Sequence, residues 1–281
     1  GNVALVHNDS GENENAISSI SEVNVNASGT INEEAITIAG SVEVSSSAEV
    51  QVGDITIDGS AEANVNSQGN ANAYFTGVND DIVDVGNEED GYGGFKAFSG
   101  VSMNGDGVSV GGSVKSEAVA GTTVGNIDID GSAISTMTDP DGYGGYGYSD
   151  VRFEGIDGDV VDIETYGGAV AAYSKVEIDG RNGGVEIGDD VTSMATALNS
   201  VGTIDIDGSA TINRGSSGQP YAYFTGIEDD VIDVNSRDAE GIDTFSSVRM
   251  SGYQLNVGGS VTSDAASLAT VGTINIDGSA R

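Results

Sequence analysis

Apolar and polar residues alternate along most of this chain. In residues 127–130, two isoleucines occupy alternate positions and two aspartates occupy the others. A period of two puts the isoleucines on one face of an extended strand and the aspartates on the other. Gly131, which follows, predicts a sharp corner with positive φ. Helical periodicity is nearly absent. The best helical candidate is the alanine-rich stretch of residues 194–198, but the equivalent segments of the other repeats favour strand or loop.

A ten-residue motif with this alternation occurs four times. Its copies are VGDITIDGSA, VGNIDIDGSA, VGTIDIDGSA and VGTINIDGSA, and they begin at Val52, Val124, Val201 and Val271. Successive copies are therefore 72, 77 and 70 residues apart. A shorter apolar motif begins 19 residues before the first isoleucine of each copy, at Ile36, Val108, Val185 and Leu255. Identical offsets in four units indicate an internal structural repeat.

The repeat predicts an all-β protein, a parallel β-helix (β-solenoid) built from units of about 72–77 residues. Strand-and-corner segments recur at about 19–27 residues, and we expect each of them to form one rung. Residues 1–34 are predicted to be a strand-bearing cap or assembly arm. The solenoid is predicted to cover residues 35–281, in units 52–123, 124–200, 201–270 and 271–281, the last of them partial. The alternative is a row of β-sandwich domains of about 75 residues, which need a bulkier core between two sheets.

The alternation also predicts which side chains face the interior. The aligned isoleucines are expected to point inward: Ile55, Ile127, Ile204 and Ile274. The aspartates between them are expected to face solvent: Asp128, Asp130, Asp205 and Asp207.

Charge narrows the classes of partner. The chain has 45 acidic and 9 basic side chains, which give a formal net charge of −36. We expect no binding to nucleic acid, because there is no basic stripe to replace phosphate counterions, and no docking on anionic membranes. Such a charge favours solubility, mutual repulsion and attraction of cations. A saline or calcium-bearing environment suits the protein, because salt screens the repulsion.

Two absences limit the chemistry further. The chain has no cysteine, so it has no disulfide and no thiolate-based metal site. It has no run of about 20 apolar residues, so we expect no membrane insertion.

Residues 35–65 contain the pattern I-x-I-x-G-S-V…V-G-x-I-x-I-x-G-S-A. This pattern resembles the rungs of secreted bacterial β-helix proteins of the filamentous haemagglutinin and autotransporter-passenger kind. It is also similar to bactofilins, cytoskeletal β-helices that polymerise end to end. Residues 4–20 are similar to curlin-type repeats, although they lack the glutamine ladder. The resemblance implies an adhesive, matrix or fibre role at the cell surface or outside the cell, with cell-surface glycans among the partners.

An acidic motif occurs once in each unit, in the sequences GVNDDIVDV, GIDGDVVDI and GIEDDVIDV. Three or four oxygen-bearing side chains within six residues suit Ca²⁺, which takes six to eight oxygen ligands in flexible geometry. The alternative is that they are solvated corner residues. The candidate calcium ligands are Asn79, Asp80, Asp81, Asp84, Asp157, Asp159, Asp162, Glu228, Asp229, Asp230 and Asp233.

A glycine- and tyrosine-rich segment follows Thr138. Asp139 and Asp141 lie in it and are further candidate cation ligands. Its tyrosines are candidates for adhesive or subunit contacts, since tyrosine supplies contact area at low entropic cost. The alternative is a surface loop without a ligand.

Catalysis has little support in the sequence. His7 is the single histidine, and no nucleophile motif accompanies it. A β-helix enzyme that acts on acidic polysaccharide needs a basic cleft, whereas the nine basic residues are scattered. We therefore expect no enzyme, and a carbohydrate-active enzyme remains the second alternative function.

The chain ends suggest how the protein functions. Residues 271–281 stop inside a repeat, and residues 2–6 read as a strand, so both ends of the predicted solenoid expose unpaired backbone. We expect a self-assembling filament, sheath or matrix subunit, a head-to-tail homopolymer aided by divalent cations. The first alternative is a segment of a β-helical adhesin or S-layer protein.

Overall fold

The computed structural model describes residues 3–7, 9–10, 16–26, 35–66, 70–84, 94–138, 148–165, 170–214, 219–236 and 242–281. All regular elements in these ranges are strands, numbered β1 to β24. The described part of the chain holds no helix of the length and apolarity that crossing a bilayer demands. The prediction of an all-β protein is confirmed, and residues 194–198 lie within a strand.

Three sheets contain the two sequence motifs and the strand between them. Sheet A comprises β1 (Val3–His7), β5 (Val42–Val52), β11 (Val114–Val124), β17 (Val191–Val201) and β23 (Val261–Val271). Sheet C comprises β4 (Ala35–Ile38), β10 (Gly107–Val110), β16 (Val185–Ile187) and β22 (Leu255–Val257). Sheet D comprises β6 (Ile55–Asn66), β12 (Ile127–Thr138), β18 (Ile204–Arg214) and β24 (Ile274–Ala280).

Three further sheets complete each turn of the chain. Sheet B comprises β2 (Asp9–Ser10), β3 (Ala16–Asn26), β9 (Gly94–Asn104), β15 (Val170–Asp179) and β21 (Ile242–Ser251). Sheet E comprises β7 (Ala71–Asn79), β13 (Tyr148–Asp157) and β19 (Gln219–Ile227). Sheet F comprises β8 (Val83–Asp84), β14 (Val161–Thr165) and β20 (Ile232–Ser236).

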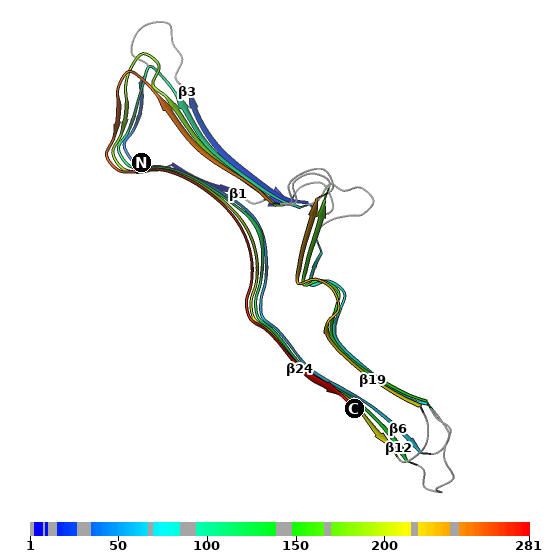
Figure 1. Ribbon diagram of the computed structural model, residues 1–281. Helices are drawn as coiled ribbons and strands as arrows, with labels where there is room; N and C mark the ends of the chain where they lie inside the picture. The colour runs from blue at the N-terminus through cyan, green and yellow to red at the C-terminus, as the bar shows by residue number, and fades with distance from the viewer. Residues whose placement is uncertain are drawn as a thin grey trace.

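Successive turns stack in parallel and in register, as in a parallel β-helix or solenoid. Val42 pairs with Val114, Val114 with Val191, and Val191 with Val261. The antiparallel β2–β3 pair is the exception among the described pairings. Figure 1 looks along this stack and shows a thin, bent coil, with sheets A and D on one long side and sheets B and E on the other.

The prediction that segments of about 19–27 residues form separate rungs is wrong. Ile36 lies in sheet C and Ile55 in sheet D, so the two motifs are different sides of one coil. The strands from β5 to β10 pass through all six sheets before β11 returns to sheet A. One coil is therefore much longer than the strand spacing indicated.

Burial follows the predicted alternation within the stack. Ile127 and Ile204 are 1% and 0% exposed, and the four aspartates predicted to face solvent are exposed. Ile55 is half-buried, and Ile274 is 42% exposed. The prediction that all four isoleucines are buried inside the coil is therefore wrong for Ile274. The exposure arises because no further described strand of sheet D covers β24.

Gly131 has a different role from the predicted corner. It lies within β12, and a Cβ atom built there would be 2.7 Å from two ring carbons of Phe75. Phe75, Phe153 and Phe224 form an internal stack with centroid separations of 5.1 Å. The glycines that follow the IxID pattern therefore make room for these rings between sheets D and E.

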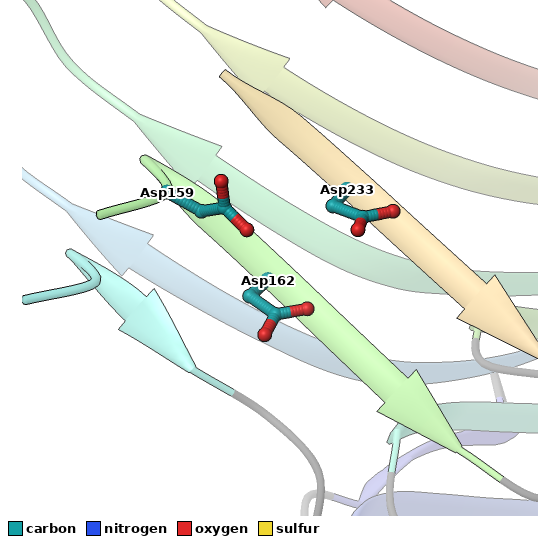
Figure 2. Close-up of side chains that lie close together, drawn as sticks. All are labelled: Asp159, Asp162 and Asp233. Carbon is teal, nitrogen blue, oxygen red and sulfur yellow. The ribbon is translucent and has the colours of Figure 1, made fainter. Parts of the chain in front are cut away.

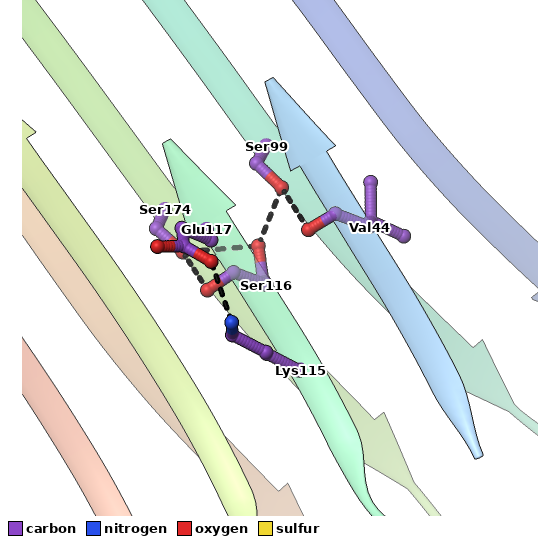
Figure 3. Close-up of polar contacts among 6 residues, drawn as sticks. All are labelled: Val44, Ser99, Lys115, Ser116, Glu117 and Ser174. Atoms are coloured by element: carbon purple, nitrogen blue, oxygen red, sulfur yellow. Dashed lines mark hydrogen bonds and ion pairs between the residues drawn. The ribbon is translucent and has the colours of Figure 1, made fainter. Parts of the chain in front are cut away.

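A seam of buried serines joins sheets A and B between the two hydrophobic clusters of the core. The Ser99 hydroxyl donates to the Val44 carbonyl oxygen at 3.1 Å, and the Ser116 hydroxyl donates to Ser99 at 2.9 Å. Ser174 donates to the Ser116 carbonyl oxygen at 3.0 Å, and Ser193 donates to Ser174 at 2.8 Å. Figure 3 shows the first three serines of this seam. Hydrogen bonding satisfies hydroxyls that would otherwise be costly to bury.

Candidate functional site

The acidic motifs lie at the corner between sheets E and F. Asn79 pairs with Asp157, and Asp162 pairs with both Asp84 and Asp233. The three copies are therefore stacked over one another in adjacent coils, as their alignment in the sequence implied. The side chain of Asp84 lies outside the described residues, as do Asp139 and Asp141 entirely.

Two carboxylates at this corner form hydrogen bonds between coils, a role that the sequence did not reveal. The Asp81 carboxylate accepts a hydrogen bond from the backbone N–H of Asp159 at 2.7 Å. The Asp159 carboxylate accepts one from the backbone N–H of Asp230 at 2.6 Å. A carboxylate in one coil thus satisfies a backbone donor of the next coil at the point where the strands bend.

The same arrangement occurs at other corners. Asp54 accepts from the Asn126 N–H at 2.8 Å, and the Asn126 side chain accepts from the Thr203 N–H at 2.9 Å. Asp190 accepts from the Ser260 N–H at 2.6 Å. In each pair, acceptor and donor are one coil apart in the sequence. The pairs could therefore be recognised from the sequence only with knowledge of the coil length.

Three carboxylates form the best candidate cation site among the described residues. Oxygens of Asp159, Asp162 and Asp233 lie within 4.8 Å of one another, and all three side chains are half-buried. Figure 2 shows Asp159 and Asp162 on one chain segment and Asp233 on the neighbouring strand. Carboxylate oxygens suit Ca²⁺, and a shared cation offsets the repulsion between like charges.

The electrostatics of Asp159 agree with a crowded acidic site. Burial, together with the nearby carboxylates of Asp81, Asp233 and Asp229, raises the pKa of Asp159 above its ordinary value. The backbone hydrogen bond from Asp230 acts in the opposite direction. The trio combines residues from two coils, whereas the sequence grouped candidates within one loop. The remaining candidates lie outside it: Asn79, Asp80, Asp81, Asp157, Glu228, Asp229 and Asp230.

A second acidic surface follows the outer face of sheet D. Asp58, Asp130, Asp207 and Asp277 are in register across four coils. They line a groove of about 720 Å³ together with the glycine and serine that follow each of them and with Arg281, the one basic residue among the described residues of the groove. Like charges directly opposite each other in a sheet are destabilising, so this surface attracts counterions.

The last described coil presents an apolar face. Leu255, Val261, Ile274 and Ile276 are 52%, 51%, 42% and 47% exposed. Their partners one coil earlier, Val185, Val191, Ile204 and Ile206, are each at most 1% exposed. The two sets of side chains hold the same positions in the repeat. Their exposures differ because no further described strand covers the last coil.

No protein-family model, curated protein or solved structure matches this chain.

Proposed function

We propose that this protein is a non-catalytic, extracellular structural subunit that assembles end to end by stacking coils. The observation that carries the proposal is the apolar face formed by β22, β23 and β24 in the last described coil. Burying exposed apolar side chains is favourable by about 25 cal/mol per Å². At β24, the edge of sheet D that no described strand covers also offers N–H and C=O groups to another strand.

The opposite end of the stack offers a matching surface. Sheet D begins with β6, where Ile55 and Ile57 are half-buried, although their partners Ile127 and Ile129 are at most 1% exposed. β1 pairs with β5 only from Val42 to Ser46, so the rest of that edge has no described partner strand.

A second copy of the chain is the occupant that fits this face. Within the chain, β6, β12 and β18 are each covered by the next IxIxGSA strand of sheet D in the same register. The β6 strand of a second copy has that pattern and can lie on β24. In this arrangement the β1 strand of the second copy is displaced from β5, because β23 of the first copy takes its place in sheet A. Such contacts join two different surfaces, and they produce a filament when the rotation between subunits does not close.

We further propose that divalent cations, calcium above all, aid assembly. Chains of net charge −36 repel each other, and salt weakens this repulsion. Asp159, Asp162 and Asp233 are the residues that would hold the ion.

Negative-stain microscopy and light scattering test the assembly, in calcium and salt at high protein concentration. We expect filaments from the unchanged chain and none from Ile274→Asp with Ile276→Asp, which puts charge on the apolar face. The matched control is Asn275→Asp with Ser279→Asp, which adds the same charge to the outer face of the same strand. An unchanged chain that remains monomeric contradicts the proposal, and a segment of an adhesin or S-layer protein then becomes the leading interpretation.

A further inference from the structure

The outer face of sheet E carries a tyrosine patch that the proposed assembly does not use. Tyr74, Tyr148, Tyr221 and Tyr223 are 51%, 51%, 57% and 51% exposed. Arg152 pairs with both Tyr74 and Tyr223 in the ladder, so it lies between them. We define the tyrosine patch as these five residues with Asp150. It spans three successive coils, through β7, β13 and β19.

The polar groups of the tyrosine patch hold one another in place. The Tyr74 hydroxyl donates to Asp150 at 3.0 Å, and the Arg152 guanidinium forms an ion pair with Asp150 at 3.2 Å. The guanidinium lies 5.6 Å from the centroid of the Tyr74 ring. The Tyr148 and Tyr221 rings stack with centroids 6.2 Å apart. Side chains arranged in this way lose less conformational freedom when a ligand binds.

The charge of the patch distinguishes it from the rest of the molecule. Asp150 and Arg152 balance formally, and Glu154 on the same face of β13 adds one negative charge, whereas the chain as a whole carries −36. An anionic polymer is repelled by that net charge. A cationic peptide meets Arg152 at the centre of the patch, and a second copy of the chain can approach only where salt or cations screen its own charge of −36. An uncharged polymer is the ligand that meets neither the repulsion of the net charge nor that of the Arg152 guanidinium.

We infer that the tyrosine patch binds a neutral polysaccharide. Tyrosine presents an apolar ring and a polar hydroxyl together, which suits a sugar with C–H surfaces and hydroxyl groups. Asp150 and Arg152 supply an acceptor and donors for those hydroxyls. Coils repeat at about 4.8 Å, so a linear chain running along the stack meets equivalent positions in successive coils. Exposed apolar patches with polar groups around them commonly mark binding sites.

Binding of the full chain to a panel of polysaccharides tests this inference. The panel contains cellulose, chitin, soluble starch and a soluble neutral β-glucan, with alginate as the anionic polymer and polylysine as the cationic one. The patch variant is Tyr221→Ser with Tyr223→Ser. The matched control, Phe245→Ser with Tyr253→Ser, removes two aromatic rings that are 54% and 85% exposed outside the patch. Thermal unfolding verifies that both variants remain folded.

We expect affinity for at least one neutral polysaccharide, reduced by about tenfold or more in the patch variant and unchanged in the control. The inference is overturned if no neutral polysaccharide in the panel binds. It is also overturned if the two variants lose binding equally, or if polylysine is the only polymer bound. Loss of self-association in the patch variant, with polysaccharide binding intact, assigns the patch to a second copy and overturns it too. Monomeric protein suffices for the measurement, so its result is independent of end-to-end assembly.

Discussion

Glycine at fixed positions sets the separation of sheets D and E. The Cβ atom that Gly131 lacks would lie 2.7 Å from the Phe75 ring and 2.8 Å from the Gly59 carbonyl oxygen. Real Cβ atoms essentially never approach other atoms this closely. In the DGS part of the repeat, the glycine is therefore required by internal packing, whereas the aspartate before it faces solvent.

Gly131→Ala should reduce the free energy of unfolding by about 1–3 kcal/mol, because the added methyl group forces the Phe75 ring or the backbone to move. Gly53→Ala is the matched control, since a Cβ at Gly53 meets no atom within 4 Å. Urea unfolding of both variants measures the difference. Equal stability of the two variants would show that the interior is looser than described.

Tyr173 makes the stability depend on alkaline pH. Its hydroxyl donates to Asp243 at 2.5 Å, and this hydrogen bond, with partial burial, raises its pKa to about 12. Because the pKa is raised above about 10, the usual value for tyrosine, the stabilisation is complete below pH 10. It is lost as the pH rises towards 12. Asp243→Asn should lower the pKa of Tyr173, which absorbance titration detects. An unchanged titration curve would contradict this.

Among the elements, sheets A and B depend on the serine seam. Its hydroxyls continue from coil to coil, and Ser246 extends it by donating to the Ser193 carbonyl oxygen at 2.8 Å. The seam separates the alanine- and phenylalanine-containing cluster from the valine-rich cluster. Small hydroxyl side chains let the two sheets approach closely there, and the hydroxyls of Ser99, Ser116, Ser174 and Ser193 are all hydrogen-bonded.

Ser174→Ala should lower the free energy of unfolding by about 1–3 kcal/mol, because the buried Ser193 hydroxyl loses its acceptor. Ser60→Ala on the exposed outer face of β6 is the control and should change stability by about 0.5 kcal/mol at most. Thermal and urea unfolding compare them. A Ser174 variant as stable as the control would mean that the seam contributes no net stability.

Strands could be predicted from the sequence because alternation is a local property. Ile127 and Asp128 take opposite faces of β12 whatever surrounds them. The coil could not be predicted in the same way, because the 19-residue offset between Ile36 and Ile55 reports two sheets of one coil. Only the longer spacing, such as that between Val42 and Val114, corresponds to stacked strands.

The candidate cation site was predictable in kind and in part. The acidic motifs drew attention to Asp159, Asp162 and Asp233, although as members of separate loops. Their proximity arises from stacking of β14 on β20, which depends on the register between coils. The prediction of a corner at Gly131 was wrong because the glycine is required by contact with Phe75, a residue that is distant in the sequence.

At the scale of the whole molecule, charge and cation binding should be coupled. Calcium at about a hundredfold excess over its Kd should raise the melting temperature by about 5 °C or more, through mass action. Asp162→Asn with Asp233→Asn should remove this shift. Asp128→Asn with Asp205→Asn is the control, because it removes two exposed charges from sheet D.

Calorimetry at matched ionic strength, with sodium chloride in place of calcium chloride, separates specific binding from screening. A calcium shift of equal size in both variants would show that the acidic corner is a solvated surface.

Disulfide trapping tests end-to-end stacking in register most directly, because the chain has no cysteine of its own. In the repeat, Thr56, Asp128, Asp205 and Asn275 occupy one column of sheet D. If β6 of a second copy lies on β24, its Thr56 comes about 4.8 Å from Asn275, within the range for a disulfide. We therefore expect Thr56→Cys with Asn275→Cys to form covalent ladders on non-reducing gels under mild oxidation. Asp128→Cys with Asn275→Cys, one coil out of register, should remain mostly monomeric. Equal cross-linking of the two pairs, or none by the first, would contradict the account.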